Sequence, residues 1–188
     1  MVNNFTQERR TINVDDTRFI FRTNFAGDPE KDRFGDSRRK ACLIIPDIEQ
    51  AKDIMKMGFK VSQTKPRQND DPENFQPEYY VTILLQYRKR NGEPVKYAPK
   101  VYLVQEDGSK VQLDEETAAM IDDIRVKNVN VVLSERVYGP GENDRNLYVR
   151  TMYVEQRMDD DPYAARYASP ADSGEDCDEF PEVPEDDF

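Results

Sequence analysis

The amino-acid sequence predicts a mainly-β fold: a small barrel with one or two short helices, followed by an acidic, disordered C-terminal tail. Several short segments are rich in β-branched and aromatic residues or alternate apolar with polar residues, as strands do. Turn signals such as Asn91-Gly92 and Asp107-Gly108 separate them. No βαβ spacing recurs along the chain, which argues against a parallel sheet. The packing pattern stops after Arg157, where the composition becomes acidic.

The expected strands follow one another with long loops between them. In the first strand, Phe19, Phe21 and Phe25 fall on one side of the two-residue alternation and predict a core face, whereas Arg18 and Arg22 lie on the other side. A loose polar arm is expected at residues 1–17 and strands at 18–25, 38–45, 79–88, 97–105, 128–137 and 147–156, with a short extended segment at 59–62.

Short helices are expected at two places between these strands. Asp47 can cap the first helix, Gln50 is placed for the reciprocal bond of a capping box, and Gly58 closes the helix. A second helix is expected from residues 113–114 to about Ile124. Five or more β segments with so few helices favour an OB-fold-like barrel as the most economical arrangement.

The charge of the chain is concentrated at its C-terminal end. Residues 158–188 hold 12 of the 38 Asp and Glu residues but a single base, Arg166. The remaining 26 acids and 26 bases balance each other, so the formal net charge of −11 belongs to the tail. We therefore expect a neutral folded domain over residues 1–157 and an acidic tail over 158–188 that recruits other proteins.

Composition excludes several kinds of chemistry. The chain has no histidine, the commonest general base and metal ligand, and its two cysteines, Cys42 and Cys177, form neither a disulfide framework nor a metal-binding spacing. We expect no enzymatic activity, no cofactor and no bound metal. No apolar run approaches the ~20 residues that a membrane-spanning helix needs, and no secretion signal is apparent. A cytoplasmic location, with no membrane partner, is expected.

The body mixes basic and aromatic residues on the same segments. Cations neutralise phosphates, and aromatic rings stack on unpaired bases of any sequence, so this mixture predicts binding of single-stranded nucleic acid. Strand tyrosines and surface bases also occur for purely structural reasons, which makes the collective pattern stronger than any one residue. The candidate nucleic-acid-binding residues are Arg22, Arg38, Arg39, Lys40, Lys60, Lys65, Arg67, Tyr80, Tyr87, Arg88, Lys89, Arg90, Tyr97, Lys100, Tyr102, Tyr148 and Arg150.

The tail ends in a compact group of possible contacts. Phe188 offers a ring for an apolar pocket, and Glu185, Asp186 and Asp187 offer anions for a basic rim. The same charges imitate a phosphate backbone. We therefore expect the tail to bind partner proteins and to compete with nucleic acid for the cationic surface of the body.

A neutral barrel-like body with basic-aromatic strands and an acidic tail ending Asp-Asp-Phe resembles single-stranded DNA-binding proteins, especially the small OB-fold proteins of tailed phages. The body resemblance runs through residues 21–25, 79–87 and 147–154. It implies coating of single-stranded DNA in replication, recombination and repair, and recruitment of polymerase, helicase or primase through the tail. It also implies a homodimer and, for a phage protein, the host cytoplasm. The chain has no tryptophan, a frequent stacking residue in such proteins.

Two alternatives from other functional classes remain open at the level of sequence. An acidic DNA mimic could inhibit a nucleic-acid enzyme, although a mimic should carry its acids on the folded surface, and here the body is neutral. Carboxylate pairs such as Asp122 with Asp123 could hold magnesium in a nuclease. The charge expected on an exposed helix face is the much stronger explanation of that pair.

Overall fold

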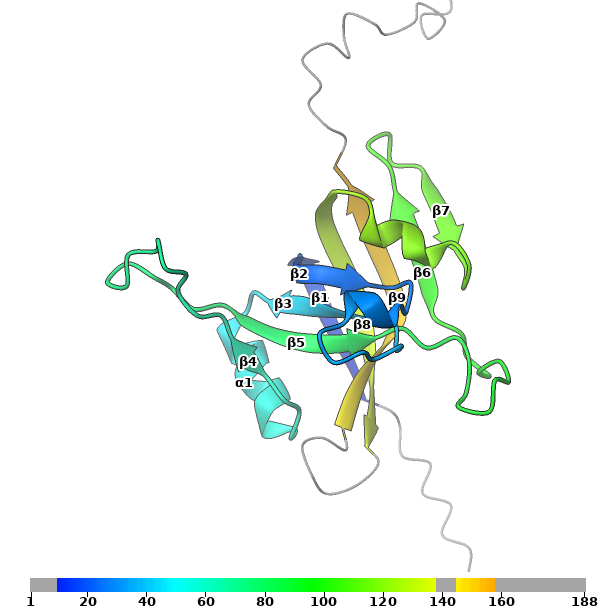
Figure 1. Ribbon diagram of the computed structural model, residues 1–188, viewed down its shortest axis with the longest axis horizontal. Coiled ribbons are helices and arrows are strands. Elements are labelled where there is room, and N and C mark those ends of the chain that lie inside the picture. The colour runs from blue at the N-terminus through cyan, green and yellow to red at the C-terminus, as the bar shows by residue number, and fades with distance from the viewer. Residues whose placement is uncertain (1–9, 138–144, 158–188) are drawn as a thin grey trace, which may run out of the picture. The chain divides into compact units, whose positions relative to one another are not determined.

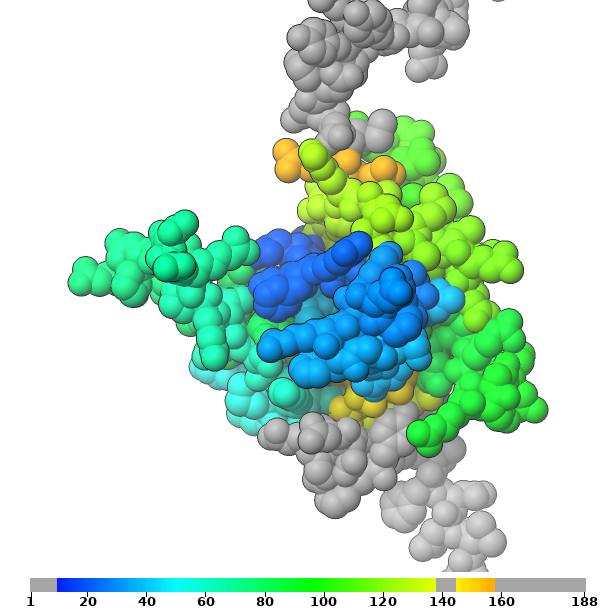
Figure 2. All heavy atoms as spheres, in the orientation of Figure 1, coloured from blue at the N-terminus to red at the C-terminus, as the bar shows by residue number. Residues whose placement is uncertain are grey.

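The computed structural model describes residues 10–137 and 145–157, which form a mainly-β body (Figures 1 and 2). The strands are β1 (Thr11–Thr17), β2 (Phe19–Asn24), β3 (Lys40–Ile45), β4 (Ser62–Gln63), β5 (Tyr79–Leu84), β6 (Lys100–Val104), β7 (Lys110–Leu113), β8 (Val126–Val137) and β9 (Arg145–Gln156). They join in one sheet whose main path runs β1-β8-β9-β5-β3-β2. The prediction of a mainly-β fold is confirmed.

Arg18 separates β1 from β2, and this junction joins the two ends of the sheet path. β1 pairs antiparallel with β8, and β2 pairs antiparallel with β3. At the junction, the Ile44 amide donates to the Arg18 carbonyl (3.1 Å), and the Thr17 hydroxyl donates to the Ile44 carbonyl (2.5 Å). One continuous segment therefore contacts both β8 and β3, so the sheet curls around its apolar core.

The strand β9 lies at the centre of this arrangement. It pairs antiparallel with β8 along one edge. Along the other edge, Leu147 and Tyr148 pair in parallel with β5, and the later residues of β9 pair in parallel with β6. Through β9, the chain thus brings β5 and the β6–β7 hairpin to the same edge of one long strand.

The helix α1 (Ile48–Lys56) begins and ends near the predicted positions. The Asp47 side chain accepts a hydrogen bond from the Glu49 amide (2.9 Å), and Gly58 follows the helix with a φ of +91°. Gln50 does not form the predicted capping box. Its side-chain amide donates instead to the Asn13 carbonyl of β1 (2.6 Å). Gln50 therefore ties the helix to the sheet.

The second predicted helix is much shorter than expected. Only Ala118–Asp122 is helical, as the 3₁₀ turn η2, and a further 3₁₀ turn, η1, covers Pro29–Lys31. The Asp122 carboxylate, whose side chain is 1% exposed, accepts hydrogen bonds from the Thr23 hydroxyl (2.7 Å) and from the amides of Phe25 (2.8 Å) and Ala26 (2.9 Å). Asp122 therefore fastens η2 to the end of β2. It does not lie on an exposed helix face.

The core lies inside the curled sheet, under α1 and η2. Val81 and Ile83 of β5 are buried, as is Leu85, which follows the strand. Ala51 and Ile54 of α1 pack into the same core. The largest fully buried side chains are Phe25, Leu43, Ile45, Ile54, Ile83, Ile121, Leu133 and Met152, followed by valines of β1, β5, β6 and β8.

Two predictions about the N-terminal part are wrong. The expected loose arm is a strand from Thr11 onward, because Ile12 and Val14 alternate with polar residues and are buried where β1 pairs with β8. Phe21 does not share the core with Phe25. The ladder between β2 and β3 shifts register between Ile20 and Asn24, and this shift turns the Phe21 side chain to the surface.

The other boundaries differ by a few residues. The strands that were expected at 38–45, 79–88 and 97–105 are β3, β5 and β6, each shorter at one or both ends, and β7 was not expected. None of the helices in residues 10–137 and 145–157 is long and apolar enough to cross a membrane.

Candidate nucleic-acid interface

Three adjoining cavities form a groove across the described body. Their volumes are about 500, 920 and 730 Å³. Arg38 and Asn146 line both the first and the second cavity, and Arg136 and Tyr148 line both the second and the third. Because neighbouring cavities share walls, they form one continuous surface, which we call the basic groove.

The basic groove runs across the strands. Lys40 of β3 pairs with Leu84 of β5, Leu84 pairs with Tyr148 of β9, and Tyr148 pairs with Ser134 of β8. All four residues line the groove. The segment between β5 and β6, which projects at the right of Figure 1, supplies residues 88–90 and 96–99 to the second and third cavities.

The walls of the basic groove are strongly cationic. Among the described residues that line its three cavities, Glu115 is the one acid. A cleft that carries one sign of charge attracts a polyanion and raises its rate of association. The basic lining residues are Arg38, Arg39, Lys40, Lys60, Arg88, Lys89, Arg90, Lys96, Lys100, Arg136, Arg145 and Arg150.

Some of these cations already have partners in the body. The Lys40 ammonium lies between the carboxylates of Asp32 (2.7 Å) and Asp36 (3.3 Å), and Arg38 pairs with Asp36 (2.7 Å). The hydrogen bond from Arg38 holds the pKa of the Asp36 carboxyl well below its usual range. Burial alone would lower the pKa of Lys40, but its bonds to the two carboxylates raise it overall. This cluster fastens the loop between β2 and β3 to β3.

Other cations in the groove form salt bridges to exposed acids or donate hydrogen bonds to backbone carbonyls. Arg88 donates to the Glu115 carboxylate (2.9 Å), and Lys89 lies 3.8 Å from Glu93. Arg39 donates to the carbonyls of Phe25 (3.0 Å) and Glu115 (2.7 Å), and Arg145 donates to the Met57 carbonyl. Arg39 and Arg145 are therefore positioned by the backbone that surrounds them.

A third group of cations is exposed and makes no ion pair with any described residue. It consists of Lys60 in the first cavity, Arg90 in the second, and Lys96, Lys100 and Arg150 in the third. These side chains spread along the whole groove. They can approach phosphates without first breaking an internal salt bridge.

Aromatic rings lie beside these cations. The Arg136 guanidinium is 4.6 Å from the ring centre of Tyr148, where the second and third cavities meet. Tyr97, in the third cavity, is 74% exposed and has the Lys96 ammonium 5.3 Å from its ring centre. Tyr80 lies in the first cavity and contacts Phe21 edge to face. Each cavity thus offers at least one ring for stacking.

Tyr87 also borders the second cavity, but it belongs to the core. It is 9% exposed, and its buried hydroxyl has no hydrogen-bond partner. Burial raises the pKa of Tyr87 to about 12. Arg39 lies over its ring at 5.5 Å, so the pair packs within the body.

Four of the residues that the sequence assigned to nucleic-acid binding do not line the basic groove. Lys65 and Arg67 lie in the 64–77 loop, which projects from the body at the left of Figures 1 and 2. Arg22 borders a smaller cavity beside η2, which shares only Phe21 with the first cavity of the groove. Tyr102 stacks on Tyr153 at 4.9 Å on the outer side of β6 and β9.

The tail residues Glu185, Asp186, Asp187 and Phe188 lie outside the described residues. Their assignment to partner binding stays a prediction.

Sequence reasoning missed four groove residues, namely Phe21, Lys96, Arg136 and Arg145. Arg136 lies near the end of β8 and Arg145 begins β9, and their position relative to β5 depends on the parallel pairing of β5 with β9. Lys96 is adjacent to Tyr97 and could have been found by the same basic-aromatic pattern. Phe21 was assigned to the core by the alternation of its strand.

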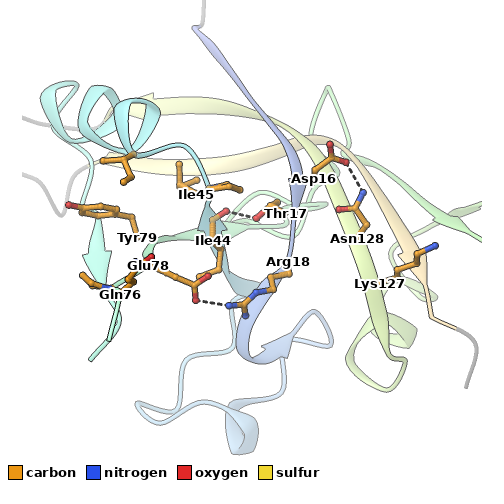
Figure 3. A pocket seen from close by; sticks show the side chains of 13 residues that line it. Asp16, Thr17, Arg18, Ile44, Ile45, Gln76, Glu78, Tyr79, Lys127 and Asn128 are labelled. Carbon is orange, nitrogen blue, oxygen red and sulfur yellow. Dashed lines mark hydrogen bonds and ion pairs between the residues drawn. The ribbon is translucent and has the colours of Figure 1, made fainter. Parts of the chain in front are cut away.

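A fourth cavity, of about 430 Å³, lies between β1, β3 and the segment before β5 (Figure 3). Three of its four charged side chains are already engaged, because Arg18 pairs with Glu78 (2.6 Å) and Asp16 accepts a hydrogen bond from Asn128 (3.1 Å); Lys127 is the fourth. It does not offer the run of cations that a polynucleotide needs. Within the part of the chain that the structure describes, no group of three or more His, Cys, Asp or Glu could hold a metal ion.

The fold and the groove define a mainly-β protein with a cationic, aromatic-lined surface that suits a single polynucleotide strand. A sequence model of the family described as "Putative phage ssDNA-binding domain" matches residues 3–186, and this chain belongs to that family. The structure is similar to the crystal structure of gp2.5, a single-stranded DNA-binding protein encoded by bacteriophage T7. The TM-score is 0.41 and the identity 13%, with 81% of this chain and 94% of that chain covered. No curated protein sequence gives a significant match.

Proposed function

We propose that this protein coats single-stranded DNA without strong sequence preference and that the strand lies in the basic groove. The observation that carries this proposal is the row of cross-strand neighbours from Lys40 through Leu84 and Tyr148 to Ser134, which lines one continuous groove with a single acid in its walls. A flexible strand can follow such a path, whereas a stiff duplex presents no unpaired bases for the rings.

Different residues of the basic groove contact different parts of the bound strand. Lys60, Arg90, Lys100 and Arg150 neutralise phosphates, because they are exposed and make no ion pair with any described residue. Tyr148 and Tyr97 stack on bases, and stacking accepts any base because every base has a π face.

The curled sheet is consistent with an OB-type barrel. Five strands, namely the β1–β2 segment, β3, β5, β8 and β9, form the closed part, and β5 and β9 are its parallel pair. OB barrels bind oligonucleotides on the face of their second and third strands and on neighbouring loops. Here those strands are β3 and β5, which line the first cavity with Lys40, Cys42, Tyr80, Thr82 and Leu84.

We further propose that the protein acts in DNA replication, recombination and repair as a homodimer and that residues 158–188 recruit a polymerase, helicase or primase. The acidic composition of these residues and the terminal Phe188 support this role. The same anions are suited to the basic groove, so the tail competes with DNA. Deleting residues 158–188 should therefore tighten binding to DNA and abolish recruitment of partners.

Fluorescence anisotropy with labelled oligo-dT tests the proposal, with a duplex of equal length as the control. We expect saturable binding to oligo-dT that weakens as salt rises, and weaker binding to the duplex. Absence of oligo-dT binding at low salt would refute it and favour the acidic DNA mimic. Equal or weaker affinity in the truncated protein would refute the competition by the tail alone.

A further inference from the structure

Phe21 is held in a backbone conformation that bulky residues rarely adopt. Its φ is +64°, in the left-handed region, where the Cβ atom of an L-residue crowds the following carbonyl oxygen. The register of β2 on β3 shifts between Ile20 and Asn24, so Phe21 lies at the irregular part of this ladder. Strained residues of this kind concentrate at functional sites, where the strain is retained because the geometry is needed.

The strain does not serve the core. The Phe21 side chain is 64% exposed, whereas Phe25, which the alternation places on the same face, is fully buried. A phenyl ring that stays in water contributes little to burial of apolar surface. Its ring contact in the folded body is with Tyr80, at 5.4 Å between ring centres and an interplanar angle of 82°. An edge-to-face pair leaves ring faces open to a flat partner.

The surroundings of this ring pair are those of a nucleotide site. Phe21 and Tyr80 both line the first cavity of the basic groove, together with Lys60 and Arg145. None of the described residues that line this cavity is an acid. Unpaired nucleobases bind between or against aromatic rings, and the phosphate next to such a base needs a cation within reach.

We propose that Phe21 and Tyr80 form a subsite for one unpaired nucleobase at the β2–β3 end of the basic groove, with Lys60 contacting the adjoining phosphate. This subsite rests on the proposed function, since it places one base of the same bound strand. The left-handed backbone at Phe21 serves to direct the ring out of the core and over the cavity.

Phe34 provides a matched control for the experiment. It is also an exposed phenylalanine, at 86%, with a basic neighbour, since Arg33 lies 5.7 Å from its ring centre. It lines none of the three groove cavities. Stacking that is specific to the subsite should therefore appear at position 21 and not at position 34.

Tryptophan fluorescence reads out stacking directly, because the full-length chain has no tryptophan of its own. Phe21→Trp should be strongly quenched on titration with oligo-dT, because a base stacks on the indole. Phe34→Trp should bind with the same affinity as the wild type and change little in intensity. Intensity at position 21 that changes no more than at position 34 would overturn the subsite.

Affinity provides the second readout. Phe21→Leu keeps an apolar side chain but lacks a ring, and should bind oligo-dT about 5- to 150-fold more weakly, which corresponds to the loss of about 1–3 kcal/mol per stacked base at 1.4 kcal/mol per tenfold. On an abasic oligonucleotide the two proteins should bind alike. Phe34→Leu should match the wild type on both.

Stability separates a binding role from a structural one. Phe21→Gly relieves the left-handed strain, so its melting temperature should equal or exceed that of the wild type, while its affinity for oligo-dT falls as in Phe21→Leu. A lower melting temperature combined with unchanged affinity would show that Phe21 serves the fold, and would overturn the subsite. If wild-type protein binds oligo-dT but every position-21 variant binds equally well, the subsite fails and the proposed function stands.

Discussion

Removing the unpaired cations of the basic groove should change the salt dependence of binding in a calculable way. The triple variant Lys60→Gln, Lys100→Gln and Arg150→Gln deletes three exposed bases that line the groove and have no ion pair among the described residues. Each phosphate contact on a single strand contributes about 0.7 to the slope of log K against log salt. The slope should therefore become shallower by about 2.

The same arithmetic gives the loss of affinity. The plots of wild type and variant should converge near 1 M salt and separate as salt falls, so that at 0.1 M the variant binds oligo-dT about 100-fold more weakly. Anisotropy titrations at four or more salt concentrations measure both slopes. Circular dichroism melts of both proteins should be alike, which would confirm that the substitutions leave the fold unchanged.

A matched triple variant removes the same net charge from other places. Arg22→Gln, Lys65→Gln and Arg67→Gln changes three bases outside the groove, all of which the sequence pattern had assigned to DNA binding. Its slope should stay close to that of the wild type. Equal slope changes in the two triple variants would refute the groove as the path of the strand, because binding would then follow net charge alone.

Three further predictions concern stability and accessibility. Tyr87→Phe removes a buried hydroxyl that has no hydrogen-bond partner among the described residues, and should raise the free energy of unfolding by about 1 kcal/mol. The affinity for oligo-dT should not change. Weaker binding would show that Tyr87 contacts DNA. Asp122→Asn replaces one carboxylate oxygen with an amide donor, which then faces either the Ala26 amide or the Thr23 hydroxyl and the Phe25 amide. Urea unfolding should therefore show a loss of about 2 kcal/mol, and a loss below about 1 kcal/mol would contradict the anchoring role. Hydrogen bonds from Lys40 and Arg38 hold the pKa values of Asp32 and Asp36, respectively, below the ordinary 3.8, so the two carboxylates stabilise the fold above that pH and lose this effect as pH falls through their folded pKa values. The melting temperature of Asp36→Asn should therefore depend less on pH in this acid range than that of the wild type. Parallel curves would show that the Asp36 carboxylate does not stabilise the fold.

The outward position of Phe21 shows most clearly where sequence reasoning stops. Alternation places Phe19, Phe21 and Phe25 on one face, and nothing in the residues themselves marks a register shift. The shift belongs to the pairing of β2 with β3, and beyond it the Asp122 carboxylate of η2, about 100 positions away, binds the Thr23 hydroxyl and the Phe25 amide. Tertiary pairing, which the alternation does not record, therefore decides which phenylalanine faces the groove.

The sequence by itself determined the mainly-β class, the position of α1 and the separation of a neutral body from an acidic tail, because these depend on local alternation, capping and composition. It also identified most of the cations that line the basic groove. Tertiary structure alone decided which of those cations remain without an internal partner and which rings face the groove. The reason is physical: the groove forms where β3, β5, β9 and β8 lie side by side, and the pairing of strands distant in sequence is not recorded in the pattern of any one of them.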